Sequence, residues 1–435
     1  MSDVSIGLSL LGLLICLLML RMPIGITLIS VSFSGLWILK GPKVAWGALA
    51  MIPYQFSASW VLSSIPMFLL LGYICFYMGL TQGLFRAARL WLSWLPGGLG
   101  ISAIAGAAGF AAVSGSSIAC SATIGRIAVP EMLKARYEPG FAGALVAAAG
   151  TIGALIPPSI ILILYGIIAQ QSIAKLFLGG LAAGLVTIFA YVTLIFLRAK
   201  FQPGVAPRID VQVTRAEKLA ALWETWPLIL TVITIFGGIF FGVFTPTEAG
   251  AAGAFIALII AIAKGEFTWK RLQTAAFETL LSTSMLLIIG IGASLLTRFL
   301  TISGAAKYLS GLVISAGVDP TLLMIGMVLI YLLLGMFLEP LGCMLLTLPI
   351  LLPILHAQGF DMILFGIILC KLLEIGMLTP PVGMNVFVVK SVVGNSIRTG
   401  QIFRGVMWFI ILDLCLVALF WTVPEIITTL PAMIR

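Results

Sequence analysis

Gly376-Met377-Leu378-Thr379-Pro380-Pro381 follows the same pattern as Gly153-Ala154-Leu155-Ile156-Pro157-Pro158, which lies 223 positions earlier in the chain. Adjacent prolines lack backbone N–H donors and end an α-helix, so each stretch predicts a break inside an apolar helix. The two stretches therefore predict discontinuous helices at equivalent places in two halves of the chain.

Other landmarks recur at this spacing and extend the repeat. The pairs are Pro23 with Pro246, Trp46 with Trp269 and Pro130 with Pro353, and, with a slip of two residues, Gly83 with Gly304 and Arg86 with Lys307. We expect an internal duplication that runs from about Leu8 to Lys390. A duplicated chain with matched helix breaks is typical of secondary transporters, whose substrate and ion sites lie at the broken helices near the middle of the bilayer.

The composition predicts a membrane protein. Of the 435 residues, 61% are hydrophobic and 9% are charged, so the long apolar runs indicate several bilayer spans in one all-α polytopic domain. The net charge of +9 arises from basic residues in short loops, where they orient the spans, and gives no support for nucleic-acid binding. The six cysteines lie scattered in apolar segments and are expected to be small buried side chains.

Charged loops predict the orientation of the chain. The apolar run from Val4 to Leu20 has its first positive charge after it, at Arg21, which favours a retained span with the N-terminus outside over a cleaved signal peptide. The basic linker from Arg198 to Lys218 is expected in the cytoplasm. An odd number of crossings between equivalent positions predicts that the second repeat is inverted relative to the first.

The apolar pattern predicts similar elements in both halves. In the first half these are spans over Ile24–Leu39 and Val61–Leu80 with an interfacial segment over Val44–Ser59 between them, a re-entrant hairpin from Gly97 to Glu138, a broken span over Phe141–Gln170 and a span over Ala174–Leu197. In the second half they are spans over Leu228–Val243, Thr247–Ala263 and Leu280–Leu300, an interfacial segment near Trp269, an amphipathic arm around Lys307, a hairpin over Pro320–Leu355 and a broken span through Pro380-Pro381. A final span, Val406–Val423, is expected to have no counterpart.

The hairpin tips and helix breaks are the candidate sites, because unpaired peptide groups at membrane depth must line a cavity or be buried in protein. The first tip, Val113–Thr123, gathers hydroxyl groups that suit a small hard cation, although serine and glycine also allow close helix packing. At the second tip Glu339 is expected to face a partner or an ion, or to cap a helix. Asn385, after the second break, is expected either to contact a ligand or to satisfy freed backbone groups.

Three charged or titratable positions have less decided roles. Lys371 and Glu374 are three residues apart on one helical face, which favours an internal ion pair. Arg126 can pair with an anionic substrate, form a structural salt bridge or extend to the membrane surface. The single histidine, His356, has no catalytic or metal-binding partners nearby in the sequence, so there is no basis for an enzyme.

Several long strings resemble the large membrane subunit, of the DctM type, of tripartite ATP-independent periplasmic (TRAP) transporters. They are Ser114-Gly115-Ser116-Ser117, Ala122-Thr123-Ile124-Gly125, Pro130-Glu131-Met132, Gly150-Thr151-Ile152-Gly153, Ile156-Pro157-Pro158-Ser159 and the run from Glu374 to Phe387. The resemblance covers nearly the whole chain. It implies an elevator-type fold, similar to the ion transporter superfamily, with two re-entrant hairpins and two broken helices in a moving transport domain.

The resemblance also implies which residues bind ions and substrate. Carried over to this chain, it nominates for sodium Ser114, Ser116, Ser117 and Gly153 at one site and Glu339, Gly342, Gly376 and Thr379 at the other. Family members often have aspartate where this chain has Glu339. For the substrate the candidates are Ser117, Thr123, Arg126, Pro158 and Asn385. Sodium is the only ion implied, as the coupling ion, with no cofactor.

The implied function is sodium-coupled import of an organic acid, such as a C4-dicarboxylate or sialic acid, across the bacterial inner membrane. The implied partners are a small four-helix membrane subunit, expected as a separate chain because none precedes Met1, and a periplasmic substrate-binding protein. A stand-alone sodium/dicarboxylate symporter is the alternative. An intramembrane enzyme lacks a catalytic constellation, and a passive channel fits poorly with an inverted duplication.

The predicted domains follow the repeat. They are scaffold and arm at 1–95, the first half of the transport domain at 96–172, a connecting helix and linker at 173–222, the second scaffold and arm at 223–317, the second half of the transport domain at 318–398 and a C-terminal transmembrane helix at 399–435.

Overall fold

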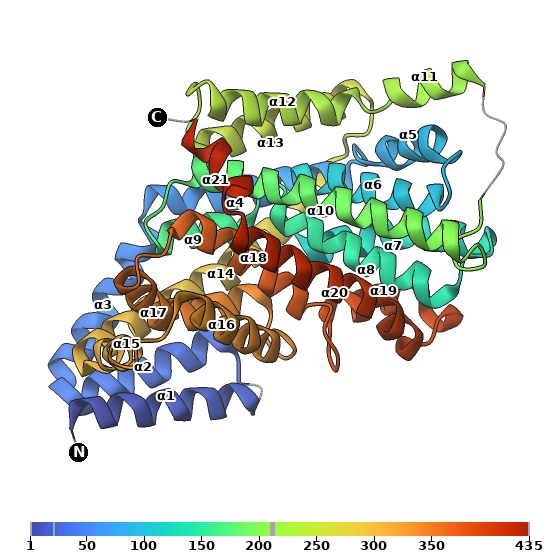
Figure 1. Ribbon diagram of the computed structural model, residues 1–435. Helices are drawn as coiled ribbons and strands as arrows, with labels where there is room; N and C mark the ends of the chain where they lie inside the picture. The colour runs from blue at the N-terminus through green and yellow to red at the C-terminus, as the bar shows by residue number, and fades with distance from the viewer. Residues whose placement is uncertain (1, 21, 209–213, 434–435) are drawn as a thin grey trace.

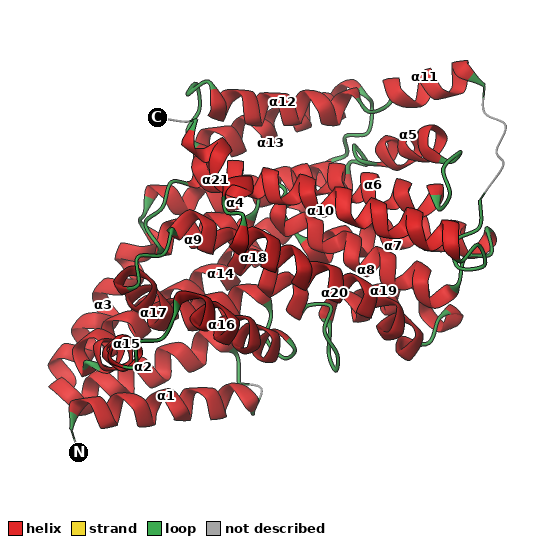
Figure 2. Cartoon of the chain, in the orientation of Figure 1, coloured by secondary structure: helices red, strands yellow, loops and turns green. Residues whose placement is uncertain are grey.

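The computed structural model describes residues 2–20, 22–208 and 214–433, and within these ranges it contains helices and no β-strand (Figure 2). Six helices in the described ranges are long and apolar enough to cross a membrane, or up to eight if each of two bent helix pairs is one span. The predicted all-α polytopic membrane fold is therefore confirmed. The charge at Arg21 and the part of the basic linker at 209–213 lie outside the described residues.

The helices of the first half follow the predicted order. They are α1 (Asp3–Met19), α2 (Ile24–Lys40), α3 (Pro42–Ser57), the 3-10 turn η1 (Trp60–Ser63), α4 (Ser64–Tyr77), α5 (Gln82–Leu92), α6 (Gly98–Ser114), α7 (Ser117–Lys134), α8 (Pro139–Leu155), α9 (Ile160–Ile168) and α10 (Ile173–Phe201). Here α6 and α7 form the first hairpin. The first broken helix consists of α8 and α9, which meet at a bend of 41°.

The second half repeats this order. Its helices are α11 (Arg215–Trp223), α12 (Trp226–Phe240), α13 (Pro246–Ala263), α14 (Trp269–Ser303), α15 (Ala305–Ser315), α16 (Pro320–Gly335), α17 (Pro340–Ala357), α18 (Met362–Gly376), α19 (Met384–Val393), the 3-10 turn η2 (Gly394–Ser396), α20 (Thr399–Thr422) and α21 (Glu425–Ala432). The second hairpin is α16–α17, and the second broken helix is α18–α19. Both predicted hairpins and both breaks are confirmed.

The two halves differ before their hairpins. The prediction of a separate interfacial segment near Trp269 is wrong, because α14 continues without interruption over 35 residues. The equivalent part of the first half is divided into α3 and α4 by Ala58 and the extended Ser59. The physical reason is local: α3 contains Pro53 and ends in small polar residues, whereas no glycine or proline interrupts the first five turns of α14.

The final span was expected to have no counterpart, and this is also wrong. By its place in the chain, α20 follows the second broken helix as α10 follows the first. α10 packs against α18 of the second half, and α20 packs closely against α8 of the first half. Each half therefore supplies a long helix that covers the broken helix of the other half.

Packing divides most helices into two groups (Figure 1). α1, α2 and α3 pack along α14, α4 packs against α13 and α14, and α12 packs against α13; α12 and α13 lie along the upper edge in this view. α6 to α9 pack with α18 to α20, and α16 packs against α18. The groups meet where α6 contacts α4 and where α17 contacts α14. Each hairpin thus lies between a broken helix and a helix of the other group.

Candidate functional site

The tip of the first hairpin lies directly on the first helix break. Gly115 joins α6 to α7 with φ of +59°, a left-handed conformation that glycine adopts without strain. A Cβ at this position would meet the carbonyl oxygen of Pro158, in the segment between α8 and α9. Ser116 then caps α7 by accepting a hydrogen bond from the N–H of Ala119 at 3.4 Å. Both the left-handed backbone and the close approach of Pro158 therefore require glycine at position 115.

Three of the four residues predicted for the first sodium site come together here. A Cβ at Gly153, near the end of α8, would lie 3.0 Å from the carbonyl oxygen of Ser116 and 3.2 Å from the nitrogen of Ser117. The backbone of Ser114 lies against α4, where its Cα is 3.1 Å from where a Cβ of Gly72 would stand. The Ser114 hydroxyl is buried and has no hydrogen-bond partner.

The second hairpin tip meets its helix break through two glycines. A Cβ on Gly335, at the end of α16, would lie 2.8 Å from the Cα of Gly376 at the end of α18. Beyond Gly376, the hydroxyl of Thr379 donates to the carbonyl oxygen of Ile375 at 2.7 Å. The two backbones approach so closely that neither position has room for a side chain.

The other two residues predicted for the second sodium site are Glu339 and Gly342. Within the described residues, no contact joins either of them to Gly376. Gly342 faces Ile24 on α2, which a Cβ at Gly342 would strike. Glu339 occupies the N-cap position of α17, but its half-buried side chain makes no capping hydrogen bond. Glu339 therefore stands at the capping position of the helix, as one interpretation predicted, but its side chain does not cap the helix.

A buried hydrogen bond joins the first hairpin to the second broken helix. The hydroxyl of Ser117 donates to Oε1 of Glu374 on α18 at 3.0 Å and lies 3.5 Å from the sulfur of Met377. The Glu374 side chain is completely buried. Its other oxygen, Oε2, has no hydrogen-bond partner. The first tip therefore contacts broken helices from both repeats.

The expected ion pair between Lys371 and Glu374 is wrong. Nζ of Lys371 instead lies 2.6 Å from Oδ1 of Asp413 on α20, and both side chains are completely buried. Oδ2 of Asp413 accepts a hydrogen bond from Tyr191 on α10 at 2.7 Å, and Tyr191 lies 3.2 Å from the hydroxyl of Thr151 on α8. Sequence analysis missed Asp413, although a lone carboxylate inside an apolar span is itself a signal for a buried partner.

The residues predicted to contact substrate fall in different surroundings. Asn385 is buried, and its amide lies 3.5 Å from the carbonyl oxygen of Ala147 on α8. Thr123 donates to the carbonyl oxygen of Ala119 within its own helix, at 2.8 Å. Arg126 is exposed and has no ion pair with any described residue. The last substrate candidate, Pro158, lies under the first hairpin tip, where its carbonyl oxygen faces Gly115.

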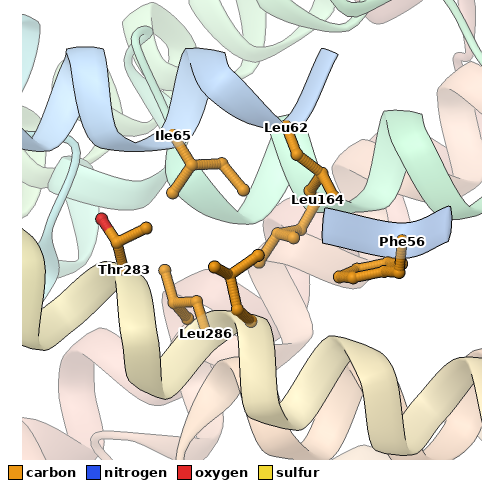
Figure 3. A pocket seen from close by; sticks show the side chains of 7 residues that line it. Phe56, Leu62, Ile65, Leu164, Thr283 and Leu286 are labelled. Carbon is orange, nitrogen blue, oxygen red and sulfur yellow. The ribbon is translucent and has the colours of Figure 1, made fainter. Parts of the chain in front are cut away.

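Two cavities lie where the two helix groups meet. The first is small and mostly apolar and has a volume of about 10 Å³, with α3, η1, α4, α9 and α14 around it (Figure 3). It is lined by Phe56, Leu62, Ile65, Leu164, Thr283, Leu286 and Leu287. The second, of about 850 Å³, lies between α3, α14 and the turn after α9 and includes Arg298 and Gln170. Neither cavity includes a residue predicted for ions or substrate.

Comparison with known proteins gives consistent matches. The family model described as the tripartite ATP-independent periplasmic transporter, DctM component, matches residues 11–426. The chain is similar to the C4-dicarboxylate TRAP transporter large permease protein DctM of Pseudomonas aeruginosa, with 33% identity over 392 residues that cover 88% of this chain and 89% of the relative. It is also similar to the sialic acid TRAP transporter large permease protein SiaM of Vibrio cholerae, with 30% identity over 423 residues that cover 96% of both chains.

A solved structure shares the fold. The YdaH transporter of Alcanivorax borkumensis, whose crystal structure is described as having an unusual topology, matches with a TM-score of 0.62 over 89% of each chain. The two sequences are 13% identical. At this identity the likeness shows the fold alone.

Proposed function

The chain belongs to the DctM component family of tripartite ATP-independent periplasmic transporters, and on this premise we propose that it is the large membrane subunit of a sodium-coupled importer of an organic acid. The observation that carries the proposal is the placement of each hairpin tip against a break in a buried helix. Polar backbone and side-chain groups gather at these two places, inside an otherwise apolar protein, as ion sites of secondary transporters require.

The proposed sodium sites are the two tip-and-break contacts. At the first, Ser116, Ser117 and Gly153 adjoin one another and Ser114 precedes them on α6. At the second, Gly376 and Thr379 lie at the break, and Glu339 and Gly342 lie near the tip of the second hairpin, at the start of α17. Hydroxyl and carbonyl oxygens are the ligands that a small hard cation prefers.

The proposed substrate is a carboxylate. The names of the two relatives refer to a C4-dicarboxylate and to sialic acid, which are both organic acids. Arg126 is exposed in the middle of α7, and its guanidinium is the group proposed to pair with the anion. Ser117, Thr123, Pro158 and Asn385 complete the proposed set around the tip and the breaks.

The proposed mechanism is an elevator. Residues 96–172 and 318–398 would move together as the transport domain, because the broken helices pack on each other and on the helices that follow them. Residues 1–95 and 223–317 would form the scaffold, joined through 173–222, and 399–435 would move with the transport domain, since α20 packs on α8. The large exposed apolar side chains of α12 to α14 suit a surface that faces lipid or the small subunit.

The proposed setting is the bacterial inner membrane, with the N-terminus in the periplasm. A small membrane subunit would complete the scaffold, and a periplasmic protein would deliver the substrate, in keeping with a tripartite family.

The test is uptake of labelled carboxylates into proteoliposomes, with an inward sodium gradient, potassium in place of sodium, and each partner omitted in turn. We expect uptake only when both partners and the sodium gradient are present. Sodium-driven uptake by this chain alone would replace the tripartite proposal with the stand-alone symporter. Uptake that is equal in sodium and potassium would contradict the coupling.

A further inference from the structure

Three charged side chains are buried together beside the first hairpin tip, and their charges do not balance. Lys371, Glu374 and Asp413 are each completely buried. Lys371 balances Asp413, whose Oδ1 lies 2.6 Å from its ammonium nitrogen. Glu374 receives only a hydroxyl hydrogen bond from Ser117, and its Oε2 has no partner. An ionised carboxylate in such a place is strongly unfavourable unless a positive charge joins it.

Further buried oxygens without partners lie on the helices around Glu374. They are the hydroxyl of Ser121 and the side-chain carbonyl oxygen of Asn385, both completely buried. Such oxygens are rare in folded proteins, and each one calls for a physical explanation.

The contacts place these residues on neighbouring turns of packed helices. Ser121 is one helical turn beyond Ser117 on α7, and a Cβ at Gly150 of α8 would strike its hydroxyl while lying 2.9 Å from the carbonyl oxygen of Ser117. The amide nitrogen of Asn385 reaches Ala147, one turn before Gly150 on the same helix. The backbone N–H of Asn385 also donates to Met377, whose sulfur contacts Ser117.

We propose that Glu374, Ser121 and Asn385, with Ser117, form a further cation-binding site that takes sodium. It lies one turn deeper along α7 and α8 than the contact between Ser116 and Gly153, and it has a full negative charge that the first tip lacks. A proton on Glu374 would neutralise the carboxylate and make it a donor, but this single donor could serve only one of the other two oxygens. A metal cation satisfies all the oxygens at once, because each of them accepts.

The site would join the two repeats. Ser117 and Ser121 belong to the first hairpin, whereas Glu374 and Asn385 belong to the second broken helix. A cation held between them would fix the first hairpin against the second broken helix, so its loss would free the tip. This inference rests on the proposed sodium coupling, and it adds a charged ligand to that coupling.

The experiment measures sodium binding to the purified membrane complex, by equilibrium binding of radioactive sodium and by the sodium-induced rise in the thermal unfolding midpoint. Glu374→Gln keeps the shape and can still accept the hydrogen bond from Ser117, but it removes the charge. We expect this variant to bind one sodium ion fewer per complex. Glu425→Gln, which changes an exposed carboxylate on α21, is the matched control and should bind as the wild type does.

An unchanged number of bound sodium ions in Glu374→Gln would overturn the site. If uptake by this variant also lost its pH dependence, the result would assign a proton to Glu374 in place of sodium. Sodium-driven uptake by the wild-type complex is measured in parallel, so that failure of this site is distinguished from failure of the proposed function.

Ser121→Ala keeps the test informative if Glu374→Gln does not fold. It removes one neutral oxygen from the far side of the site. We expect the sodium concentration for half-maximal stabilisation to rise about threefold to tenfold, in line with the loss of one modest polar contact. A wild-type sodium response in a folded Ser121→Ala protein would also contradict the site.

Discussion

The two hairpins share a backbone arrangement but are held to their helix breaks by different chemistry. At the first tip, the backbone of Gly115 lies against Pro158 and that of Ser116 against Gly153, and the side chain of Ser117 adds a hydrogen bond to Glu374. At the second tip, the contact is backbone on backbone, between Gly335 and Gly376. Duplication therefore preserved the geometry that brings a tip to a break, while the groups that fill each contact diverged.

The arms that lead into the hairpins differ in the same way. α5 is tied by Arg86 to Glu224 at 2.8 Å and by Arg89 to Glu131 of the first hairpin at 2.7 Å. No ion pair between described residues involves α15, the equivalent arm of the second half. The first half thus has polar side-chain contacts at its arm and at its hairpin tip, whereas the second half relies on packing at both places.

The largest effect should come from breaking the second tip. Gly376→Val places a branched side chain where even a Cβ would lie 2.6 Å from the Cα of Gly335, so the tip cannot close and carboxylate uptake should fall below detection. Gly326→Ala, on the same hairpin, adds a Cβ into open space and should leave uptake unchanged. Substantial uptake by a folded Gly376→Val protein would show that this contact is not needed for transport.

The buried ion pair behind the first tip should have the next largest effect, on stability. Asp413→Ala leaves Lys371 buried without its partner and should lower the free energy of unfolding by about 3–5 kcal/mol. The double variant Lys371→Met with Asp413→Leu removes both charges and should recover most of this loss. Thermal unfolding of the purified protein gives the comparison. Equal losses in both variants would mean that the charges contribute little beyond their packing.

Hydroxyl groups at the two tips should contribute unequally to sodium dependence. Replacing Ser116 and Ser117 by Ala removes two oxygens at the first tip, and the sodium concentration for half-maximal uptake should rise about tenfold or more. Thr379→Val at the second break should raise it about twofold to threefold, because this change removes a single hydroxyl oxygen. Ser391→Ala, at an exposed serine on α19, is the control. Equal shifts at both tips would remove the distinction between them.

The smallest effect should come from the first arm. Arg86→Ala removes an ion pair whose side chains are 64% and 40% exposed, so it should lower the free energy of unfolding by about 0–1 kcal/mol. Thermal unfolding at low and high salt measures it. A loss well above this range, insensitive to salt, would show that Arg86 holds α5 through packing of its hydrocarbon stem instead of its charge.

The sequence alone determined the outline of this protein. Paired prolines, glycine turns and long apolar runs determine the backbone conformation of their own segment. They therefore predicted both hairpins, both breaks and the duplication. The same strings carried the family resemblance, which the comparisons confirm. The ion and substrate residues stay predictions, although Ser116, Ser117 and Gly153 do lie together.

Only the tertiary structure decided the long-range pairings. Lys371 lies one turn from Glu374, yet it pairs with Asp413, because α20 places that carboxylate against α18. α14 is continuous where the first half is broken, and Gly342 faces α2 instead of the second break. Such choices depend on which helices cover which, and helix packing joins residues that are hundreds of positions apart. Local sequence patterns do not show which distant residues come into contact. They therefore define the elements of this transporter but not the contacts that link its two halves.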